Sequence, residues 1–328
     1  MAPILEVRNL YVSYFSHTGV ASSAIVDVSF DVRPGEILGM LGESGSGKST
    51  LGASLLRLLP ANGKIEQGGI LYEGRDILQA GPRELERMRG ARIALINQEP
   101  SFALHPTMNV SDQVSEVLAA HNFHDKKARR ERIGQVLTSL FPTETERIST
   151  SYPHQLSGGQ RQRVLIAQAI SCGPAMIVAD EPTASLDPTT QREILYVFQG
   201  LRQKFGVAII LITHNTSLLA GLADRVLILY AGRVAEIGPT ESVLSSPLHP
   251  YTRALLRCLP PFLPEAGELN CKTMLPVIPG DAPNPALLAE GCRFEPRCAD
   301  RFEDCKKREP AAVSPSGGHT VSCFKFGG

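Results

Sequence analysis

The sequence predicts an α/β fold built around a largely parallel β-sheet, and two observations carry this prediction. Apolar runs of strand length occur at 37–41, 175–179 and 207–212, and residues 51–59 carry apolar side chains at helical spacing. Buried strands that alternate with helices typically form a parallel sheet that the helices cover. The chain has 328 residues, of which 43% are hydrophobic and 20% charged, which is enough for about two domains.

The residue pattern changes at two points along the chain, and these changes predict the domain boundaries. Residues 1–245 carry the strand and helix alternation, interrupted at about 100–160 by a polar, helical stretch that is interpreted as a helical subdomain. Residues 246–328 are rich in proline and cysteine. Because proline excludes long helices and central strands, a small, loop-rich C-terminal domain is expected there.

Charge and cysteine content narrow the function classes. Lys plus Arg and Asp plus Glu both number 33, so the balance disfavours nucleic-acid binding, and the basic run 124–132 is interpreted as a solvated helix face. The start of the chain lacks a secretory pattern, and no apolar run approaches the roughly 18 residues of a membrane span. Seven cysteines, an odd number, disfavour a disulfide framework. A soluble, cytoplasmic protein is expected.

Residues 42–49, GESGSGKS, fit the phosphate-binding pattern G-x-x-x-x-G-K-[ST] between an expected strand and an expected helix. The glycines let the backbone N–H groups face phosphate oxygens, and the helix adds the positive end of its dipole. Lys48 is expected to reach the β- and γ-phosphates and Ser49 to bind Mg²⁺. The residues expected to contact a nucleotide here are Gly42, Glu43, Ser44, Gly45, Ser46, Gly47, Lys48, Ser49 and Thr50.

Two acidic residues end the apolar run 175–179, where a phosphate loop needs a second contact to its metal ion. Asp180 is expected to bind Mg²⁺, and Glu181 to act as the general base that polarises the attacking water. The alternative for this pair is a solvated strand end.

Residues 156–160, LSGGQ, follow the helical stretch and precede another helical segment. Together with the phosphate loop and Asp180–Glu181, they resemble the signature of the ATP-binding cassette (ABC) ATPases, which have a P-loop NTPase fold. The resemblance implies that this helix start binds the γ-phosphate of an ATP held by a partner subunit, so that ATP lies between two chains. The residues concerned are Ser157, Gly158, Gly159 and Gln160.

The same resemblance assigns roles to four more residues. Gln98 matches the glutamine that senses Mg²⁺ and the attacking water, and Asp187 matches a loop that crosses the dimer interface. His214 matches the histidine that contacts the γ-phosphate. Tyr14 is the candidate for stacking on adenine, with Phe15 as its rival.

The expected reaction is in-line attack of water on the γ-phosphate of ATP. Lys48 stabilises the developing charge, Glu181 takes the proton, and Gln98 and His214 position the groups. Asn215 departs from the family, which commonly has Asp after the histidine. Hydrolysis is still expected.

Three longer segments narrow the resemblance to ATPases of oligopeptide and dipeptide importers: 152–160 (YPHQLSGGQ), 246–256 (SPLHPYTRALL) and 291–298 (GCRFEPRC). This resemblance covers essentially the whole chain. It implies one of two related ATPase subunits, peripheral on the cytoplasmic face of a membrane, that drives uptake of peptides, nickel or another small solute. The implied partners are two transmembrane permeases and an extracytoplasmic peptide-binding protein.

Four cysteines near the C-terminus have the spacing C-x5-C-x6-C-x17-C, and four thiolates suit a [4Fe–4S] cluster or tetrahedral Zn²⁺. The resembled dipeptide importers hold an iron–sulfur cluster here, so a [4Fe–4S] cluster is expected, while zinc and free thiols remain alternatives. The expected ligands are Cys292, Cys298, Cys305 and Cys323, and the bystanders are Cys172, Cys258 and Cys271.

Two other functions stay open on the sequence alone. One is a cassette ATPase that does not transport, although such proteins usually carry two cassettes or a long coiled-coil insertion, for which 328 residues leave no room. The other is an importer ATPase whose cysteine cluster gates its activity in response to redox state.

Overall fold

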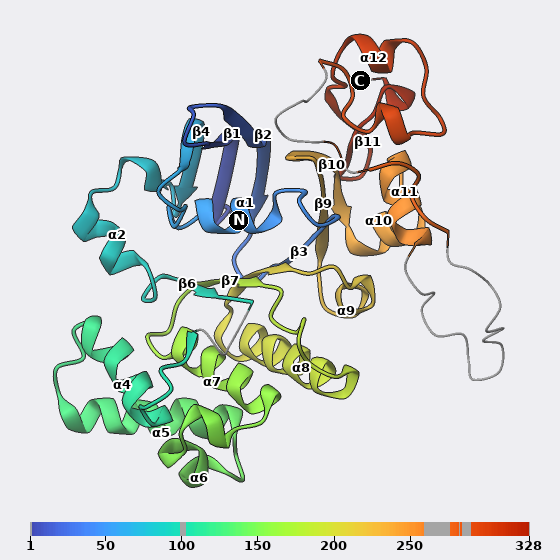
Figure 1. Ribbon diagram of the computed structural model, residues 1–328. Coiled ribbons are helices and arrows are strands. Elements are labelled where there is room, and N and C mark those ends of the chain that lie inside the picture. The colour runs from blue at the N-terminus through green and yellow to red at the C-terminus, as the bar shows by residue number, and fades with distance from the viewer. Residues whose placement is uncertain (1, 99–102, 259–275, 282, 284–289, 328) are drawn as a thin grey trace, which may run out of the picture. The chain divides into compact units, whose positions relative to one another are not determined.

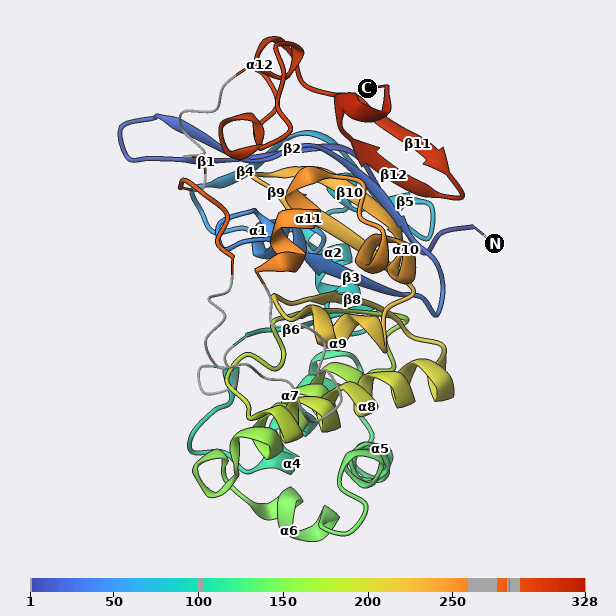
Figure 2. The same cartoon turned by 90° about the vertical axis from the view of Figure 1, so that its right-hand side faces the viewer.

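The computed structural model describes residues 2–98, 103–258, 276–281, 283 and 290–327, which fall into two compact units. The first unit comprises chiefly Arg33–Ile37 and Gln79–Ile212, and the second comprises Pro3–Val32, Leu38–Leu78 and Thr213–Gly328. Both units combine strands with helices (Figures 1 and 2). Within the described residues, no helix has both the length and the apolar character needed to cross a membrane.

The first unit contains three parallel strands in the order β6–β7–β8. β7 (Met176–Asp180) pairs on one side with β6 (Ile93–Ile96) and on the other with β8 (Ala208–Ile212). Every residue of β8 is buried, as a strand covered on both faces requires. The strands predicted at 175–179 and 207–212 are thus confirmed to within one residue.

Helices make up most of the rest of the first unit. α4, α5 and α6 pack on one another, and α4 and α5 also pack on α7. They bury one apolar stripe each, exemplified by Leu118 of α4 and Leu137 of α5, while their outer faces stay polar. The helices are α2 (Pro82–Met88), α4 (Val110–Ala120), α5 (Lys126–Leu140), α6 (Thr145–Thr150), α7 (Gly158–Ile170) and α8 (Pro188–Phe205).

The second unit contains a four-stranded antiparallel sheet that the sequence analysis did not anticipate. Its order is β2–β1–β4–β5, and bulges interrupt the register of β1 against both neighbours. The buried residues of β1 are apolar except for Ser13, and its exposed residues Arg8 and Asn9 are polar, as in a half-buried strand. The strands are β1 (Leu5–Phe15), β2 (Ala21–Val32), β4 (Gly63–Tyr72) and β5 (Arg75–Asp76).

A second sheet of this unit carries the phosphate loop. β3 (Ile37–Leu41) is fully buried and pairs in parallel with β9 (Arg225–Tyr230), which confirms the strand predicted at 37–41. β10 (Arg233–Pro239) then runs antiparallel to β9. The C-terminal hairpin of β11 (Ala312–Ser316) and β12 (His319–Ser322) adds to β10, so the chain end extends this sheet.

The described helices of the second unit are short, which agrees with the proline content of the C-terminal segment. An aromatic cluster orders this segment: the ring of fully buried Tyr251 lies 4.4 Å from that of Tyr230 and 5.4 Å from that of Phe294, centroid to centroid. The helices are α1 (Lys48–Ser54), α9 (Thr216–Ala220), α10 (Thr240–Ser245), α11 (Pro250–Arg257) and α12 (Asp304–Lys307).

Candidate functional site

The phosphate-binding segment forms the connection from β3 to α1, and two of its glycines are required by close approach. A Cβ atom on Gly42 would lie 2.2 Å from the carbonyl oxygen of Leu229, and one on Gly47 would lie 2.8 Å from that of Ala24. Gly45 has open space around it but a φ of 77°, which side chains disfavour. The backbone of this loop is therefore closely fixed by its neighbours.

The Lys48 side chain is buried and folds back over this loop. Its Nζ donates hydrogen bonds to the carbonyl oxygens of Gly42 at 2.8 Å and Glu43 at 2.9 Å, and to the Ser46 hydroxyl at 3.3 Å. A cation that rests on carbonyl oxygens can exchange these weak partners for phosphate oxygens, whose charge it complements better. The predicted role of Lys48 is compatible with this geometry.

Glu43 is held by two residues from the C-terminal segment, a contact that the sequence analysis missed. The Glu43 N–H donates to the Tyr251 hydroxyl at 2.8 Å, and the Glu43 carboxylate pairs with Arg297. Both partners lie in segments that the sequence analysis had singled out, 246–256 and 291–298, so the motifs signalled their importance without signalling this contact.

The aromatic residue proposed for the adenine base lies close to the phosphate loop. The Tyr14 hydroxyl is 3.1 Å from the Thr50 hydroxyl in α1, and the Tyr14 side chain is half-buried at the end of β1. Its rival Phe15 is equally half-buried. The geometry places Tyr14 beside α1 and leaves stacking on adenine as a prediction.

In the first unit, the structure brings together two of the predicted catalytic residues. The Gln98 side-chain amide donates to Glu181 Oε2 at 3.4 Å. Glu181 follows β7 with a left-handed φ of 44°, and its N–H donates to the Ile212 carbonyl at the end of β8. Such a backbone is costly for a residue other than glycine, and strain of this kind clusters at functional sites. Asp180, the predicted Mg²⁺ ligand, is the last residue of β7.

His214 has an exposed side chain between β8 and α9. The Thr213 N–H donates to the Met40 carbonyl of β3 at 3.1 Å, which fixes the backbone just before the histidine. The Asn215 N–H donates to the Thr213 hydroxyl in a tight turn. The exposure of His214 leaves it accessible to a nucleotide.

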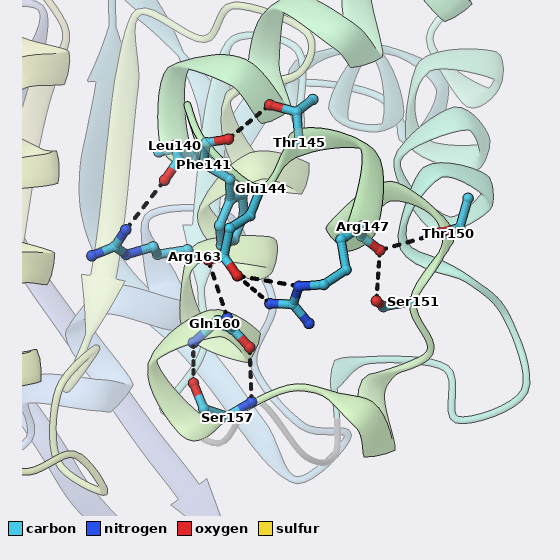
Figure 3. Close-up of polar contacts among 10 residues, drawn as sticks. All are labelled: Leu140, Phe141, Glu144, Thr145, Arg147, Thr150, Ser151, Ser157, Gln160 and Arg163. Atoms are coloured by element: carbon cyan, nitrogen blue, oxygen red, sulfur yellow. Dashed lines mark hydrogen bonds and ion pairs between the residues drawn. The ribbon is translucent and has the colours of Figure 1, made fainter.

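The signature segment starts α7, and its serine forms a reciprocal cap with Gln160 (Figure 3). The Ser157 hydroxyl accepts from the Gln160 N–H at 3.3 Å, and the Gln160 side chain accepts from the Ser157 N–H at 3.1 Å. The Gln160 amide also donates to Glu144, which pairs with Arg147. Gly158 is exposed, so the positive end of this helix faces solvent.

Asp187 caps α8 and lies against the signature helix through its neighbour Thr190. A Cβ atom on Gly159 would be 2.4 Å from Thr190 Cγ2, so only glycine fits there. The Asp187 carboxylate accepts from the Thr189 and Thr190 N–H groups, each at 3.1 Å, and from the Thr190 hydroxyl at 2.6 Å. The hydroxyl bond in particular lowers the pKa of Asp187. The predicted signature and dimer-interface residues therefore share one exposed surface.

The four C-terminal cysteines line one cavity of about 20 Å³, roughly the room that one water molecule needs. Burial raises the pKa of Cys292 to about 12 and also raises the pKa values of Cys298 and Cys323. All cysteines in the described part of the chain are free thiols; Cys271 lies outside it. Among the described residues, no three His, Cys, Asp or Glu side chains are arranged to hold a metal ion, so the predicted cluster is not confirmed.

Models of known families match both parts of the chain. The family described as ABC transporter matches residues 25–184, and the family described as the C-terminal region of the oligopeptide/dipeptide transporter matches residues 235–305. The order of the two matches agrees with the order of the motifs along the sequence.

Several characterised proteins are similar over nearly the full length. The dipeptide transport ATP-binding protein DppD of Bacillus subtilis is 40% identical over 99% of this chain and 95% of its own. The oligopeptide transport ATP-binding protein OppD of Salmonella typhimurium is 40% identical over 98% of this chain and 93% of its own. AppD of Bacillus subtilis, also an oligopeptide transport ATP-binding protein, is 38% identical over 99% and 98%.

Solved structures also match. The dimeric MJ0796 structure, a bacterial ABC transporter cassette, covers 72% of this chain and 98% of its own with a TM-score of 0.64 and 28% identity. CbiO1 from Clostridium perfringens, part of the transporter complex cbiONQ, covers 75% and 92% with a TM-score of 0.65 and 28% identity. A post-hydrolysis MJ0796 dimer bound to ADP and Pi gives a TM-score of 0.63 at 27% identity, with coverage of 72% and 98%.

Proposed function

This chain belongs to the family of ATP-binding subunits of oligopeptide and dipeptide ABC transporters, and we propose that it hydrolyses ATP to drive uptake of peptides or a related small solute. The observation that carries this conclusion is the phosphate loop, in which Gly42 and Gly47 leave no space for a side chain and Lys48 lies folded over the loop. Neither the non-transporting ATPase nor the redox-gated importer is favoured by the relatives, which are peptide transport proteins.

The reaction is attack of water on the γ-phosphate of ATP, with ADP as the leaving group. The loop N–H groups and Lys48 bind the phosphates and stabilise the charge that develops on them. Ser49, Gln98 and Asp180 would hold Mg²⁺, which supplies charge neutralisation when bound. Glu181 takes the proton from water.

Three residues assist without exchanging a proton. Gln98 donates to Glu181 in the structure, which orients the carboxylate that we assign as the base. His214 contacts the γ-phosphate and holds it in line with the water. Tyr14 stacks on the adenine.

The exposed signature surface, Ser157 to Gln160 with Asp187, supports a site completed by a second ATPase subunit. A capped helix start with free space in front of it is suited to an anion from another chain. The γ-phosphate bound by the partner would occupy this position. The partner is a related ATPase rather than a second copy of this chain.

The chain acts at the cytoplasmic face of the membrane as a peripheral subunit. Its other partners are two transmembrane permeases and an extracytoplasmic peptide-binding protein, and it binds no nucleic acid. Co-purification of the assembled complex tests these partners, and mass spectrometry of the bound solute would identify the cargo. If this chain co-purified with nucleic acid and with no permease, the assignment of its partners would be contradicted.

The base assignment is tested by Glu181→Gln in the assembled transporter. This variant should bind ATP with the affinity of the unchanged protein and hydrolyse it at least about 100-fold more slowly, the scale of a lost general base. Glu146→Gln is the matched control, because Glu146 is an exposed residue in the first turn of α6. Near-normal turnover by Glu181→Gln would refute the role of this carboxylate.

The four cysteines that line one cavity are assigned to a [4Fe–4S] cluster, with Zn²⁺ and free thiols as the alternatives. The donor set suits either group, whereas the small cavity must widen to admit a four-iron cluster. Anaerobically purified protein should be brown and contain iron and sulfide. Colourless protein with one equivalent of zinc, or with no metal, would refute the cluster.

A further inference from the structure

An ion pair joins the phosphate loop to the C-terminal cysteine segment. Arg297 Nη1 lies 2.7 Å from Glu43 Oε2, and Arg297 Nη2 lies 3.0 Å from Glu43 Oε1, so the guanidinium binds the carboxylate with both nitrogens. The Arg297 side chain is only 7% exposed and that of Glu43 is 25% exposed. An ion pair with two hydrogen bonds and little exposure to solvent is stronger than an exposed pair with a single hydrogen bond.

Further hydrogen bonds and ring packing hold both Arg297 and Glu43 in place. Arg297 also donates to the Tyr230 hydroxyl at 3.3 Å and to the Pro279 carbonyl at 3.0 Å. Tyr230 packs on Tyr251, whose hydroxyl accepts the Glu43 N–H. These contacts orient the Arg297 guanidinium toward Glu43. The C-terminal segment therefore binds both the backbone and the side chain of Glu43.

Glu43 is also connected to Lys48, the residue that we assign to the phosphates of ATP. The Glu43 carbonyl oxygen accepts a hydrogen bond from Lys48 Nζ at 2.9 Å. A movement of Glu43 would therefore displace one of the groups that hold the Lys48 amine. In addition, an unpaired carboxylate in a phosphate-binding loop would repel ATP, because like charges at short range raise the free energy of the complex. Pairing with Arg297 removes that repulsion.

We propose that Arg297 is a positioning residue for ATP binding, which neutralises Glu43 and holds the entry of the phosphate loop in its binding conformation. This inference rests on the proposed ATPase function and deepens it, because it assigns part of the nucleotide site to the C-terminal segment. Arg297 acts through Glu43 and does not touch the phosphates. The cysteine segment thereby contributes to nucleotide affinity through Glu43.

The test compares three variants of the full chain by titration with a fluorescent ATP analogue. Arg297→Met should weaken ATP binding about tenfold, the effect of about 1.4 kcal/mol of lost interaction. Glu43→Gln removes the repelling charge from the loop, and its measured ATP affinity is the reference for the double variant. The double variant Glu43→Gln with Arg297→Met should bind ATP within about threefold of Glu43→Gln, because no repelling charge remains when the arginine is lost.

Arg253→Met is the matched control. Arg253 forms an ion pair with Asp300 at 2.6 Å in the same C-terminal segment and makes no described contact with the loop. The ATP affinity of Arg253→Met should equal that of the unchanged protein. In the assembled transporter, Arg297→Met should raise KM for ATP and leave kcat within about twofold, since only binding is affected.

Unchanged affinity of Arg297→Met would overturn the proposal, and so would a double variant as weak as Arg297→Met, because the arginine would then be only structural support. If Arg297→Met proves unstable, Arg297→Lys takes its place. Its ATP affinity should be lower than that of the unchanged protein but by less than tenfold, since lysine keeps the charge and loses the bidentate geometry. Failure of the unchanged protein to bind ATP would instead refute the proposed function itself.

Discussion

Close approach between backbone atoms fixes single residues of the phosphate loop. Gly42 faces the Leu229 carbonyl of β9, a strand in the middle of its sheet that cannot move aside. Gly45, three residues later, faces open space and is constrained only by its φ of 77°. The pattern of glycines therefore combines two different requirements, one for space and one for conformation.

Substitution of these two glycines separates the two requirements. Gly42→Ala would place Cβ 2.2 Å from the Leu229 oxygen, so the loop must shift, and we expect loss of ATP binding with a lower Tm. Gly45→Ala should cost only about 1 kcal/mol of stability, the penalty of a left-handed φ. Thermal unfolding and ATP titration measure both effects. Equal Tm values for the two variants would contradict the steric explanation.

Helix caps are the features of single elements that hold the exposed signature surface of the first unit. Ser157 caps α7 with Gln160, and Asp187 caps α8 with Thr190 (Figure 3 shows the first cap). Both caps could be predicted from the sequence, because serine or aspartate followed three residues later by a suitable polar group marks a helix start. The contact of Gly159 with Thr190, which brings the two caps together, required the structure.

The Asp187 cap should make stability depend on pH in the acid range. The Thr190 hydroxyl bond lowers the pKa of Asp187 below its ordinary value of 3.8, so the folded protein favours the carboxylate. This contribution is complete above about pH 4 and is lost as the pH falls through the lowered pKa. Asp187→Asn should have a lower Tm than the unchanged protein at neutral pH, and the difference should shrink below about pH 4. A difference that persists into strong acid would disprove this origin.

At the scale of the whole molecule, a buried carboxylate joins the C-terminal segment to the rest of the second unit. Glu236 of β10 is completely buried and accepts hydrogen bonds from the Leu248 and His249 N–H groups at 2.7 and 3.0 Å. Its Oε1 also lies 2.6 Å from His319 Nε2 in β12. One side chain thus holds the start of α11 and the terminal hairpin together.

Glu236→Ala should destabilise the protein by about 3 kcal/mol, because it leaves several buried donors without an acceptor. Urea unfolding measures the loss, and hydrogen exchange should increase in α11 and β12 before it increases elsewhere. Glu241→Ala, at an exposed position of α10, is the control and should change stability by less than about 0.5 kcal/mol. Equal stabilities of the two variants would contradict this role of Glu236.

The sequence by itself determined the features that depend on neighbouring residues: the phosphate loop, the buried strands around it, the helix start at the signature segment, and the family. The tertiary structure decided the features that join distant residues. Arg297 and Glu43 are 254 positions apart, and His319 and Glu236 are 83 apart. Such polar pairs have no periodicity, and many arginines and glutamates could form them. Only the folded chain selects one partner for each.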